Sequence, residues 1–566
     1  MTHRSLTSTL ILSLLAAAGA AAPALAQQTG PSTTQSSYMV ASDPGSGVIF
    51  RSIITNGNGL AGPAGTPNES YPRLDPVTNL PIAGQNYRMV GIPDGLGAFS
   101  NGDGTFTLLM NHELGSAAGI ARTNGTGTNG SFVSRWVIGS TANGSGANFL
   151  EVTGGRDADT TVSLFSGGSY TAYNAANPLP LGGGVSRLCS GDLPAPSAFA
   201  YTAPNGTVYG TDARIFMGGE ENGAEGRAFV HIVTGPEAGN AYQLPYLGRF
   251  SWENAVANPL AQLNTVVVGS DDSTVQGGLY VYVGTRQTTG SAIERAGLTN
   301  GGLYSVSVSG TTNESPANAL GTSSLVTAAP FSLSPLNTSG NVSNITGAQL
   351  QASGVANGEM NWRRPEDAAW NPANPNQLFF VTTASVGANS RLWRMNFSDI
   401  TNPSAGGNVE MLFDGTSASS LAGGLFSATG ASTVEMMDNM CVTNDGRFVL
   451  IQEDVGGNER LGRLWLYDIA NDRVTEVGIS DASRFSTGTP GFFTNDEETS
   501  GIIDASDILG QGWFLLDMQA HYTTGLGGEL VEGGQVMALY IPQTVPAPSA
   551  AALMGLVGLA ASRRRR

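Results

Sequence analysis

The chain has 566 residues, of which 77 are glycine, 12% are charged and 40% are hydrophobic, a composition that allows a large packed core. Its formal net charge is −18, and all 26 basic residues are arginine. This acidic, lysine-free composition argues against nucleic acid as a partner, and it is suited to concentrating cations at acidic clefts.

Residues 1–27 have the pattern of a secretory signal peptide. Arg4 supplies the basic start, Leu10 to Ala22 the apolar middle and Ala24-Leu25-Ala26 a small-residue cleavage site. We therefore expect an exported protein that is periplasmic, extracellular or located at the cell surface.

Residues 28–543 are predicted to form one all-β unit. Short apolar or alternating runs are separated by Gly, Asn, Ser, Thr and Pro clusters, and no amphipathic helix pattern is sustained. This spacing is typical of β-propeller blades with long irregular loops, and a sandwich fits it less well. The polar segment Ser309 to Gly347 is expected to be an inserted loop or an irregular connection between blades. The predicted strands are Phe106 to Met110, Ala228 to Val233, Thr265 to Val268, Leu279 to Val283, Leu303 to Val308, Leu378 to Thr382, Arg391 to Phe397, Phe448 to Gln452, Leu464 to Ile469, Arg473 to Val477 and Val536 to Ile541.

The stretch Asn361 to Trp370 sets two arginines beside two acidic residues, ahead of a β-prone run. An arginine such as Arg364 suits a phosphate or carboxylate, and carboxylates such as Glu366 suit a hard cation. The alternative is a surface ion pair at a strand entry, which contributes little energy.

Cys189 lies in a second polar cluster, followed by the acidic pair Glu220-Glu221. A thiolate beside carboxylates is a mixed soft and hard ligand set that suits iron better than calcium. Because export permits disulfides, pairing of Cys189 with Cys441 is the competing interpretation.

Acidic groups recur after other predicted strands, which points to oxygen-rich cation sites. These groups are Asn111-His112-Glu113, Glu253, Asp271-Asp272, Asp438-Asn439, Glu453-Asp454 and Asp496-Glu497-Glu498. For Asn111-His112-Glu113 the alternative is a turn with a capping asparagine.

Taken in order, these clusters resemble the PhoX-type alkaline phosphatases, from about Asn111 to His521. The resemblance implies a six-bladed β-propeller with an iron pair and several calcium ions in its central funnel. It assigns phosphate binding to Arg364. It assigns metal binding to Cys189, Glu220, Glu221, Glu253, Glu366, Asp438, Glu453 and Asp454. Two positions depart from the family pattern, because Trp252 stands where a histidine is expected and Gly219 where a cysteine is expected.

Residues 544–566 resemble a PEP-CTERM sorting signal. Val545-Pro546-Ala547-Pro548 precedes an apolar run, Ala550 to Ala561, and the chain ends in Arg563 to Arg566. Ala547 replaces the glutamate of the name-giving tripeptide. This resemblance implies sorting machinery at the membrane as a partner.

We therefore expect a secreted, metal-dependent phosphoester hydrolase that acts on a small-molecule substrate. With four histidines, the chain is poor in ligands for a histidine-rich zinc centre, and it has no Ser/His/Asp or P-loop signature. One alternative is a non-catalytic, calcium-binding surface propeller for adhesion or matrix interaction. Another is a propeller esterase or lactonase that uses calcium to polarise a carbonyl.

Overall fold

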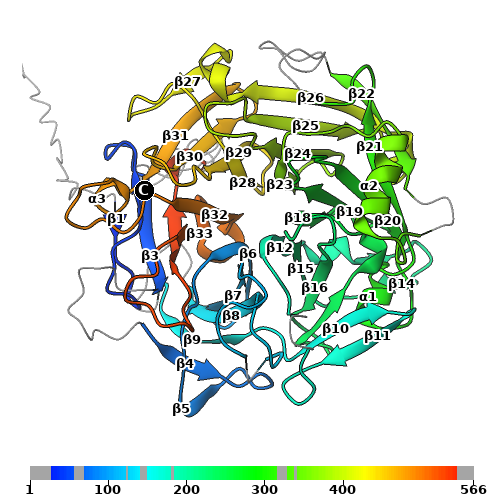
Figure 1. Cartoon of the computed structure of the whole chain (residues 1–566), viewed down its shortest axis with the longest axis horizontal. Coiled ribbons are helices and arrows are strands. Elements are labelled where there is room, and N and C mark those ends of the chain that lie inside the picture. Colours follow the sequence, from blue (N-terminus) through cyan, green and yellow to red (C-terminus); the bar gives the residue numbers. More distant parts are fainter. Residues whose placement is uncertain are drawn as a thin grey trace, which may run out of the picture.

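The computed structural model describes residues 27–56, 69–122, 125–140, 149–179, 184–314, 328–336 and 341–544. Except for Gln27 and Thr544, the predicted signal peptide and sorting tail lie outside these ranges. The described residues form a ring of six β-sheet blades around a central axis (Figure 1). The prediction of a six-bladed, all-β propeller is confirmed.

Each blade contains four antiparallel strands that follow one another from the axis outward. The first three blades are β6 (Pro93–Ser100), β7 (Thr105–His112), β8 (Phe132–Gly139) and β9 (Val152–Asp157); β12 (Leu188–Asp192), β15 (Ile215–Glu220), β16 (Ala228–Ile232) and β17 (Asn240–Gln243); and β18 (Trp252–Ala257), β19 (Asn264–Asp271), β20 (Leu279–Thr285) and β21 (Gly302–Val308).

The fourth and fifth blades have the same plan, and the sixth takes its outer strand from the beginning of the chain. These blades are β23 (Pro365–Trp370), β24 (Gln377–Thr382), β25 (Arg391–Phe397) and β26 (Gly407–Asp414); β28 (Met437–Val442), β29 (Phe448–Glu453), β30 (Arg463–Asp468) and β31 (Arg473–Ser480); and β32 (Glu497–Asp504), β33 (Trp513–Ala520), β34 (Gly533–Tyr540) and β3 (Ile49–Asn56).

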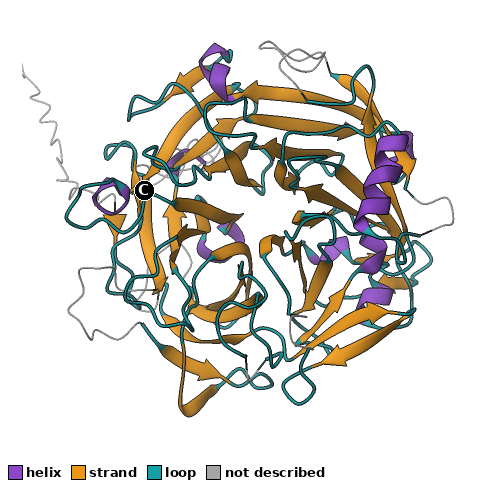
Figure 2. Cartoon of the chain, in the orientation of Figure 1, coloured by secondary structure: helices purple, strands orange, loops and turns teal. Residues whose placement is uncertain are grey.

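Shorter elements add to the six blades, and the helical share is small (Figure 2). The added strands are β1 (Gln27–Gln28), β2 (Met39–Ala41), β4 (Tyr71–Leu74), β5 (Pro81–Tyr87), β10 (Thr161–Ser166), β11 (Ser169–Tyr173), β13 (Ala200–Thr202), β14 (Val208–Gly210), β22 (Ala329–Pro335) and β27 (Gly424–Phe426). The α-helices are α1 (Ala292–Arg295), α2 (Gly347–Ala356), α3 (Ala482–Phe485) and α4 (Ser506–Leu509). Short 3-10 helices cover Pro196–Ala198, Pro245–Leu247, Pro403–Ala405, Gly415–Ser420 and Pro542–Thr544. Within the described ranges, no helix is both long and apolar enough to cross a membrane.

The segment expected to be an inserted loop or an irregular connection between blades contains a strand. β22 pairs with β21 on one side and with β26 on the other, so that the third and fourth blades share a continuous outer sheet. The strand was not predicted because Phe331 is the one buried apolar residue in it.

The ring is closed by pairing between the two ends of the chain. β3 runs antiparallel to β34, which completes the sixth blade with an N-terminal strand. The innermost strands β6, β12, β18, β23, β28 and β32 each contact the next one around the axis, and β32 contacts β6. Closure of this kind protects the inner sheet edges.

We expect Phe50→Ala in β3 to lower the free energy of unfolding by about 3–5 kcal/mol. The Phe50 side chain is 0% exposed and packs in the core between the fifth and sixth blades, against the backbone of Gly478 in β31. Denaturant unfolding measures the effect, and Val77→Ala, at a side chain that is 87% exposed, is the control. Equal stability of the two variants would show that β3 does not hold the ring closed.

Candidate metal centre

All six innermost strands carry the same irregularity. Where each pairs with the second strand of its blade, two residues of the inner strand face one residue of its neighbour. Such a β-bulge turns a side chain out of the regular alternation of a strand. The six doublets are Asp94-Gly95, Cys189-Ser190, Glu253-Asn254, Glu366-Asp367, Asp438-Asn439 and Ser500-Gly501.

In four blades, a non-glycine residue with left-handed backbone stands two residues before the doublet. The φ angles are 51° at Ile92, 49° at Arg187, 58° at Arg364 and 48° at Met436. Each costs on the order of 1–3 kcal/mol. The carbonyl of each accepts a hydrogen bond from the residue that follows the second strand, so the turn and the ligand are fixed together. These bonds run from the N–H groups of Glu113 (2.9 Å), Glu221 (2.8 Å), Thr383 (3.0 Å) and Asp454 (3.0 Å).

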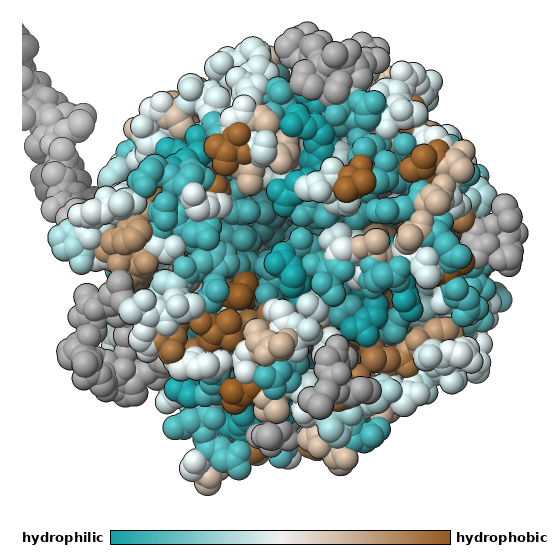
Figure 3. Space-filling model, in the orientation of Figure 1, coloured by the Kyte–Doolittle hydropathy of each residue, from teal (hydrophilic) through white to brown (hydrophobic). Residues whose placement is uncertain are grey.

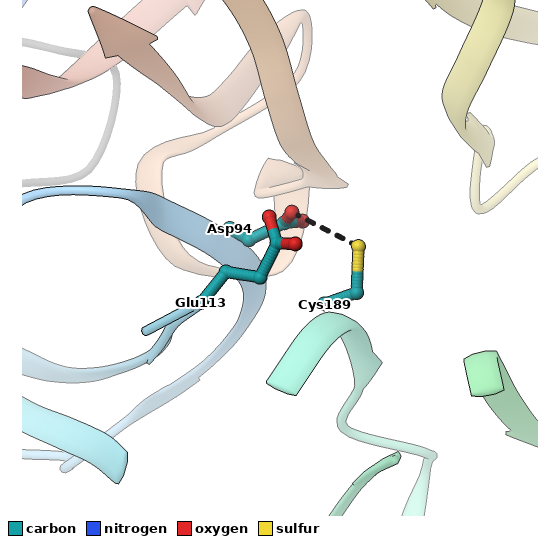
Figure 4. A group of neighbouring side chains, drawn as sticks. All are labelled: Asp94, Glu113 and Cys189. Atoms are coloured by element: carbon teal, nitrogen blue, oxygen red, sulfur yellow. Dashed lines mark hydrogen bonds between the residues drawn. The ribbon is translucent and has the colours of Figure 1, made fainter. Parts of the chain in front are cut away.

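The bulges and strand ends bring seven side chains into one continuous group, which we call the ligand band. It consists of three overlapping sets whose ligand atoms lie within 4.8 Å of one another, and the sets share Cys189 and Glu253. Figure 4 shows the first set, with the Cys189 thiol facing two carboxylates across the space between two blades. The sets are Asp94, Glu113 and Cys189; Cys189, Glu221 and Glu253; and Glu253, Glu366 and Asp438.

The ligand band is buried and carries like charges. Burial, followed by the Asp94 carboxylate, raises the pKa of the Cys189 thiol, which donates a hydrogen bond to Asp94 Oδ2 at 3.4 Å. Burial, followed by Glu366, raises the pKa of Glu253. The Glu253 side chain is 2% exposed, and its Oε1 has no hydrogen-bond partner within the described part of the chain. Burying such groups in their ionised forms is unfavourable unless cations offset them.

Two arginines lie against the ligand band, at equivalent positions in the second and fourth blades. Arg364 makes a bidentate contact to Asp272, with both N–O distances at 2.8 Å, and its Nη2 lies 3.0 Å from Glu366 Oε1. Arg187 pairs with Glu113 at 2.7 Å and also with Glu221. Burial lowers the pKa of Arg364, but Glu366 and Asp272 outweigh it and raise the pKa overall. Both guanidiniums therefore stay charged beside the band.

A known family matches the sequence over the second half of this ring. A model of the family described as alkaline phosphatase PhoX matches residues 236–503. Over these residues the sequence is similar to the PhoX family. The match covers the third, fourth and fifth blades and most of β32, and it therefore includes Glu253, Arg364, Glu366 and Asp438.

The fold is similar to that of solved structures. Pseudomonas fluorescens PhoX in complex with vanadate, a transition state analogue, has 13% identity and a TM-score of 0.56, over 88% of this chain and 95% of that chain. Trypanosoma rangeli sialidase in complex with 2,3-difluorosialic acid has 10% identity and a TM-score of 0.32, over 87% of this chain and 59% of that chain. Pseudomonas aeruginosa periplasmic gluconolactonase PpgL has 10% identity and a TM-score of 0.31, over 84% and 99%. No curated protein matches the sequence.

Of the eight residues to which the PhoX resemblance assigned metal binding, the structure brings five into the ligand band: Cys189, Glu221, Glu253, Glu366 and Asp438. The other three lie outside its three sets.

Glu220 and Glu453 are engaged elsewhere, each by an arginine that follows it in the same blade. Glu220 accepts from Arg227 Nη2 at 2.6 Å and from the Ser186 N–H at 2.9 Å. Glu453 accepts from Arg460 Nη2 at 2.6 Å and from Trp465 Nε1 at 2.9 Å. Asp454, the third residue outside the three sets, lies near enough to Glu366 to add to the effect of burial in raising the pKa of Glu366. Burial raises the pKa of Asp454 itself to about 7.

The resemblance did not assign Asp94 and Glu113 to metal binding, although Glu113 belongs to one of the acidic groups that the sequence marked as a candidate cation site. Asp94 is the first residue of the first doublet, and Glu113 stands directly after β7, just as Glu221 stands after β15. The sixth blade contributes Gln519, whose Nε2 lies 3.1 Å from Asp94, from Glu113 and from Glu498. The repeated doublet position was the signal that could have found Asp94.

The alternative of a disulfide is not realised, because both cysteines are free and buried. Cys441 lies in β28 and lines a cavity of about 250 Å³, together with residues such as Asp192 and Asp504. No residue of the ligand band lines that cavity. Cys189 is therefore available to the band.

The two departures from the PhoX pattern compensate for one another. A Cβ atom at position 219 would lie 2.4 Å from the Cβ of Trp252, which leaves no space for a cysteine there. The Trp252 ring stacks on Phe250 at a centroid distance of 3.9 Å and is buried. The Trp252 side chain thus fills the space that a cysteine at position 219 would need.

Removing metal should make stability depend on pH. The raised pKa values mean that the metal-free folded protein retains protons that the unfolded chain releases above about pH 4. The free energy of unfolding of the metal-free protein should therefore fall as pH rises from 5 to 8, a window that includes the pKa of about 7 at Asp454. Melting temperatures with chelator and with added iron and calcium, at both pH values, measure this. A metal-free protein that melts higher at pH 8 would contradict it.

Glu253→Gln should change the metal content, whereas Glu220→Gln should change the stability of the fold. Glu253→Gln should lower the bound metal content, because two of the three ligand sets include Glu253. Glu220→Gln should keep the metal but destabilise the fold by about 3–5 kcal/mol, because it removes the carboxylate that pairs with the largely buried Arg227. Elemental analysis and thermal unfolding of both variants separate the two outcomes. Equal metal loss in both would show that the boundary of the band is wrong.

Proposed function

We propose that the chain is a secreted, alkaline phosphatase-like phosphoester hydrolase with an iron and calcium centre in the propeller funnel. The observation that carries the proposal is the ligand band beside Arg364, in which seven side chains, six of them buried, form three sets that share Cys189 and Glu253. Hydrophilic residues surround the hollow at the centre of the face shown in Figure 3, which suits a charged substrate. The PhoX match and the likeness to a PhoX structure support this assignment.

The residues of the band fit both metals. The thiol of Cys189, with carboxylates on both sides, is the mixed donor set that iron accepts, whereas Glu253, Glu366 and Asp438 offer only oxygen, which calcium prefers. The unpartnered Oε1 of Glu253 is a buried acceptor that a cation would satisfy. When bound, these cations polarise phosphoryl oxygens and offset the negative charge of the band.

Arg364 is positioned to hold the phosphoryl group. Its left-handed backbone and its bidentate contact with Asp272 fix the guanidinium, and its side chain remains 29% exposed. A phosphoryl group bound beside Glu366 lies close to the guanidinium, because Nη2 already contacts Glu366. The positive charge of the guanidinium then stabilises negative charge on the phosphoryl oxygens.

The proposed substrate is a small-molecule phosphoester, since the site is a funnel within a single propeller. Export and surface delivery through the sorting tail are proposals that rest on residues 1–27 and 544–566 of the sequence. A location of the protein outside the cytoplasm agrees with the proposed calcium-containing centre.

The deciding experiment is elemental analysis of the purified protein, expressed with iron and calcium supplied, together with hydrolysis of a generic phosphomonoester. We expect both metals and turnover. Arg364→Ala should lower kcat/KM by about 10²–10³-fold with the metals retained. Cys189→Ser should lose iron and activity but keep calcium and the fold.

The control for charge removal is Arg447→Gln, at a half-exposed residue that pairs with Asp445 and lies outside the ligand band. It should keep full activity. Calcium without iron and without turnover would instead favour a non-catalytic calcium-binding propeller.

A further inference from the structure

Beside the ligand band lie two adjoining hollows that share Ser273, Thr274 and Arg364. The first hollow has a volume of about 370 Å³ and is lined by acidic residues that include Glu221 and Asp272. The second hollow has a volume of about 210 Å³ and contains no residue of the ligand band. Arg363 lines the second hollow and not the first.

Arg363 brings an uncompensated positive charge into the second hollow. Its guanidinium is partly exposed and has no hydrogen bond or ion pair with any residue in the described ranges. The one carboxylate that lines this hollow, Glu314, is paired with Arg391 at 2.9 Å and accepts from Thr382 at 3.0 Å. Arg364 is already matched by its two carboxylates. In a protein of net charge −18, this hollow therefore attracts anions.

The main chain around Arg363 is held rigidly. The Arg363 N–H donates to Glu314 Oε2 at 3.0 Å, and its carbonyl accepts from the Ala384 N–H at 3.1 Å. Trp362 before it is 1% exposed, and Arg364 after it has the left-handed backbone. A group that binds here pays little ordering entropy beyond that of the arginine side chain itself.

We propose that the second hollow binds a second anionic group of the substrate. The preferred substrate is then a phosphomonoester whose leaving group carries a carboxylate or a further phosphate a few bonds from the reacting phosphorus. This inference rests on the proposed function, which places the reacting phosphate at Arg364. Arg363 and Arg364 both line the second hollow, so they can reach neighbouring groups of one compact molecule. Arginine forks suit both carboxylate and phosphate.

Turnover by the metal-loaded protein tests the proposal with matched substrates. 3-Phosphoglycerate differs from glycerol 3-phosphate in carrying a carboxylate in place of a hydroxymethyl group. Fructose 1,6-bisphosphate adds a second phosphate to fructose 6-phosphate. In at least one pair the substrate with the additional carboxylate or phosphate should have a kcat/KM about five- to tenfold higher. For the bisphosphate this excludes the factor of two that arises because either of its two phosphates can react. The pair that shows the preference identifies the anionic group.

Arg363→Gln should abolish this preference while leaving turnover of glycerol 3-phosphate unchanged. Arg363→Lys, which keeps the charge, should retain part of the preference, and Arg447→Gln should retain all of it. No preference in the wild type, or an equal loss on both members of a pair in Arg363→Gln, would overturn the proposal.

A binding measurement separates this inference from the hydrolase proposal. Phosphonoacetate and 2-hydroxyethylphosphonate are not phosphoesters, and they differ as a carboxylate differs from a hydroxymethyl group. Calorimetry on the metal-loaded protein should show phosphonoacetate binding about five- to tenfold more tightly, and Arg363→Gln should remove the difference. Discrimination without any turnover would sustain the anion site and overturn the hydrolase. Equal binding of the two phosphonates would overturn a carboxylate-binding site, whatever the turnover shows.

Discussion

Repulsion among buried acidic groups is the constraint on which the centre of this molecule depends. Six carboxylates and one thiol share the ligand band, with neighbouring ligand atoms within 4.8 Å. At about 4 Å, two like charges repel by about 4 kcal/mol even at an effective dielectric constant of 20. A flexible scaffold would relieve this repulsion by moving the side chains apart. The ring prevents it, because each inner strand is bonded into its own blade and packed between two others.

The backbone strain follows the same plan. Ile92, Arg187, Arg364 and Met436 occupy one structural position in four different blades, so their left-handed conformations are a repeated feature rather than four separate accidents. At Ile92 the β-branched side chain makes that conformation especially unfavourable. Two of the four positions use arginine, and in both the side chain turns back to carboxylates of the band. The strain therefore positions a ligand and, in two blades, its counter-charge.

The outer architecture could be predicted from the sequence, whereas the inner strands could not. Apolar runs such as those of β20 and β29 mark strands whose faces pack between blades. The innermost strands present polar doublets to the axis, so their apolar periodicity breaks at the site. Sequence reasoning therefore found the chemistry as isolated polar clusters and did not recognise the strands that carry them.

Which residue of each acidic pair reaches the ligand band could be seen only in the structure. In Glu220-Glu221 only the second residue reaches the ligand band, and in Glu453-Asp454 the first is taken by an arginine. Successive residues point to opposite sides of a strand, and a shift of one residue exchanges them. Asp94 escaped notice because Pro93-Asp94-Gly95 reads as a turn, although the structure places it in a bulged strand.

The packing of Trp252 accounts for both departures from the PhoX pattern beside the buried Glu253 of the same strand. Gly219 and Gly269 both make room for Trp252, since a Cβ at either position would lie 2.4 Å from an atom of that tryptophan. Phe250 stacks on the same ring, so an apolar wall stands where the PhoX pattern implies a histidine and a cysteine. Burial is the leading cause of the raised pKa of Glu253, and Glu366 follows it. Because Glu253 Oε1 also has no hydrogen-bond partner in the described part of the chain, the charge on Glu253 depends on a bound cation.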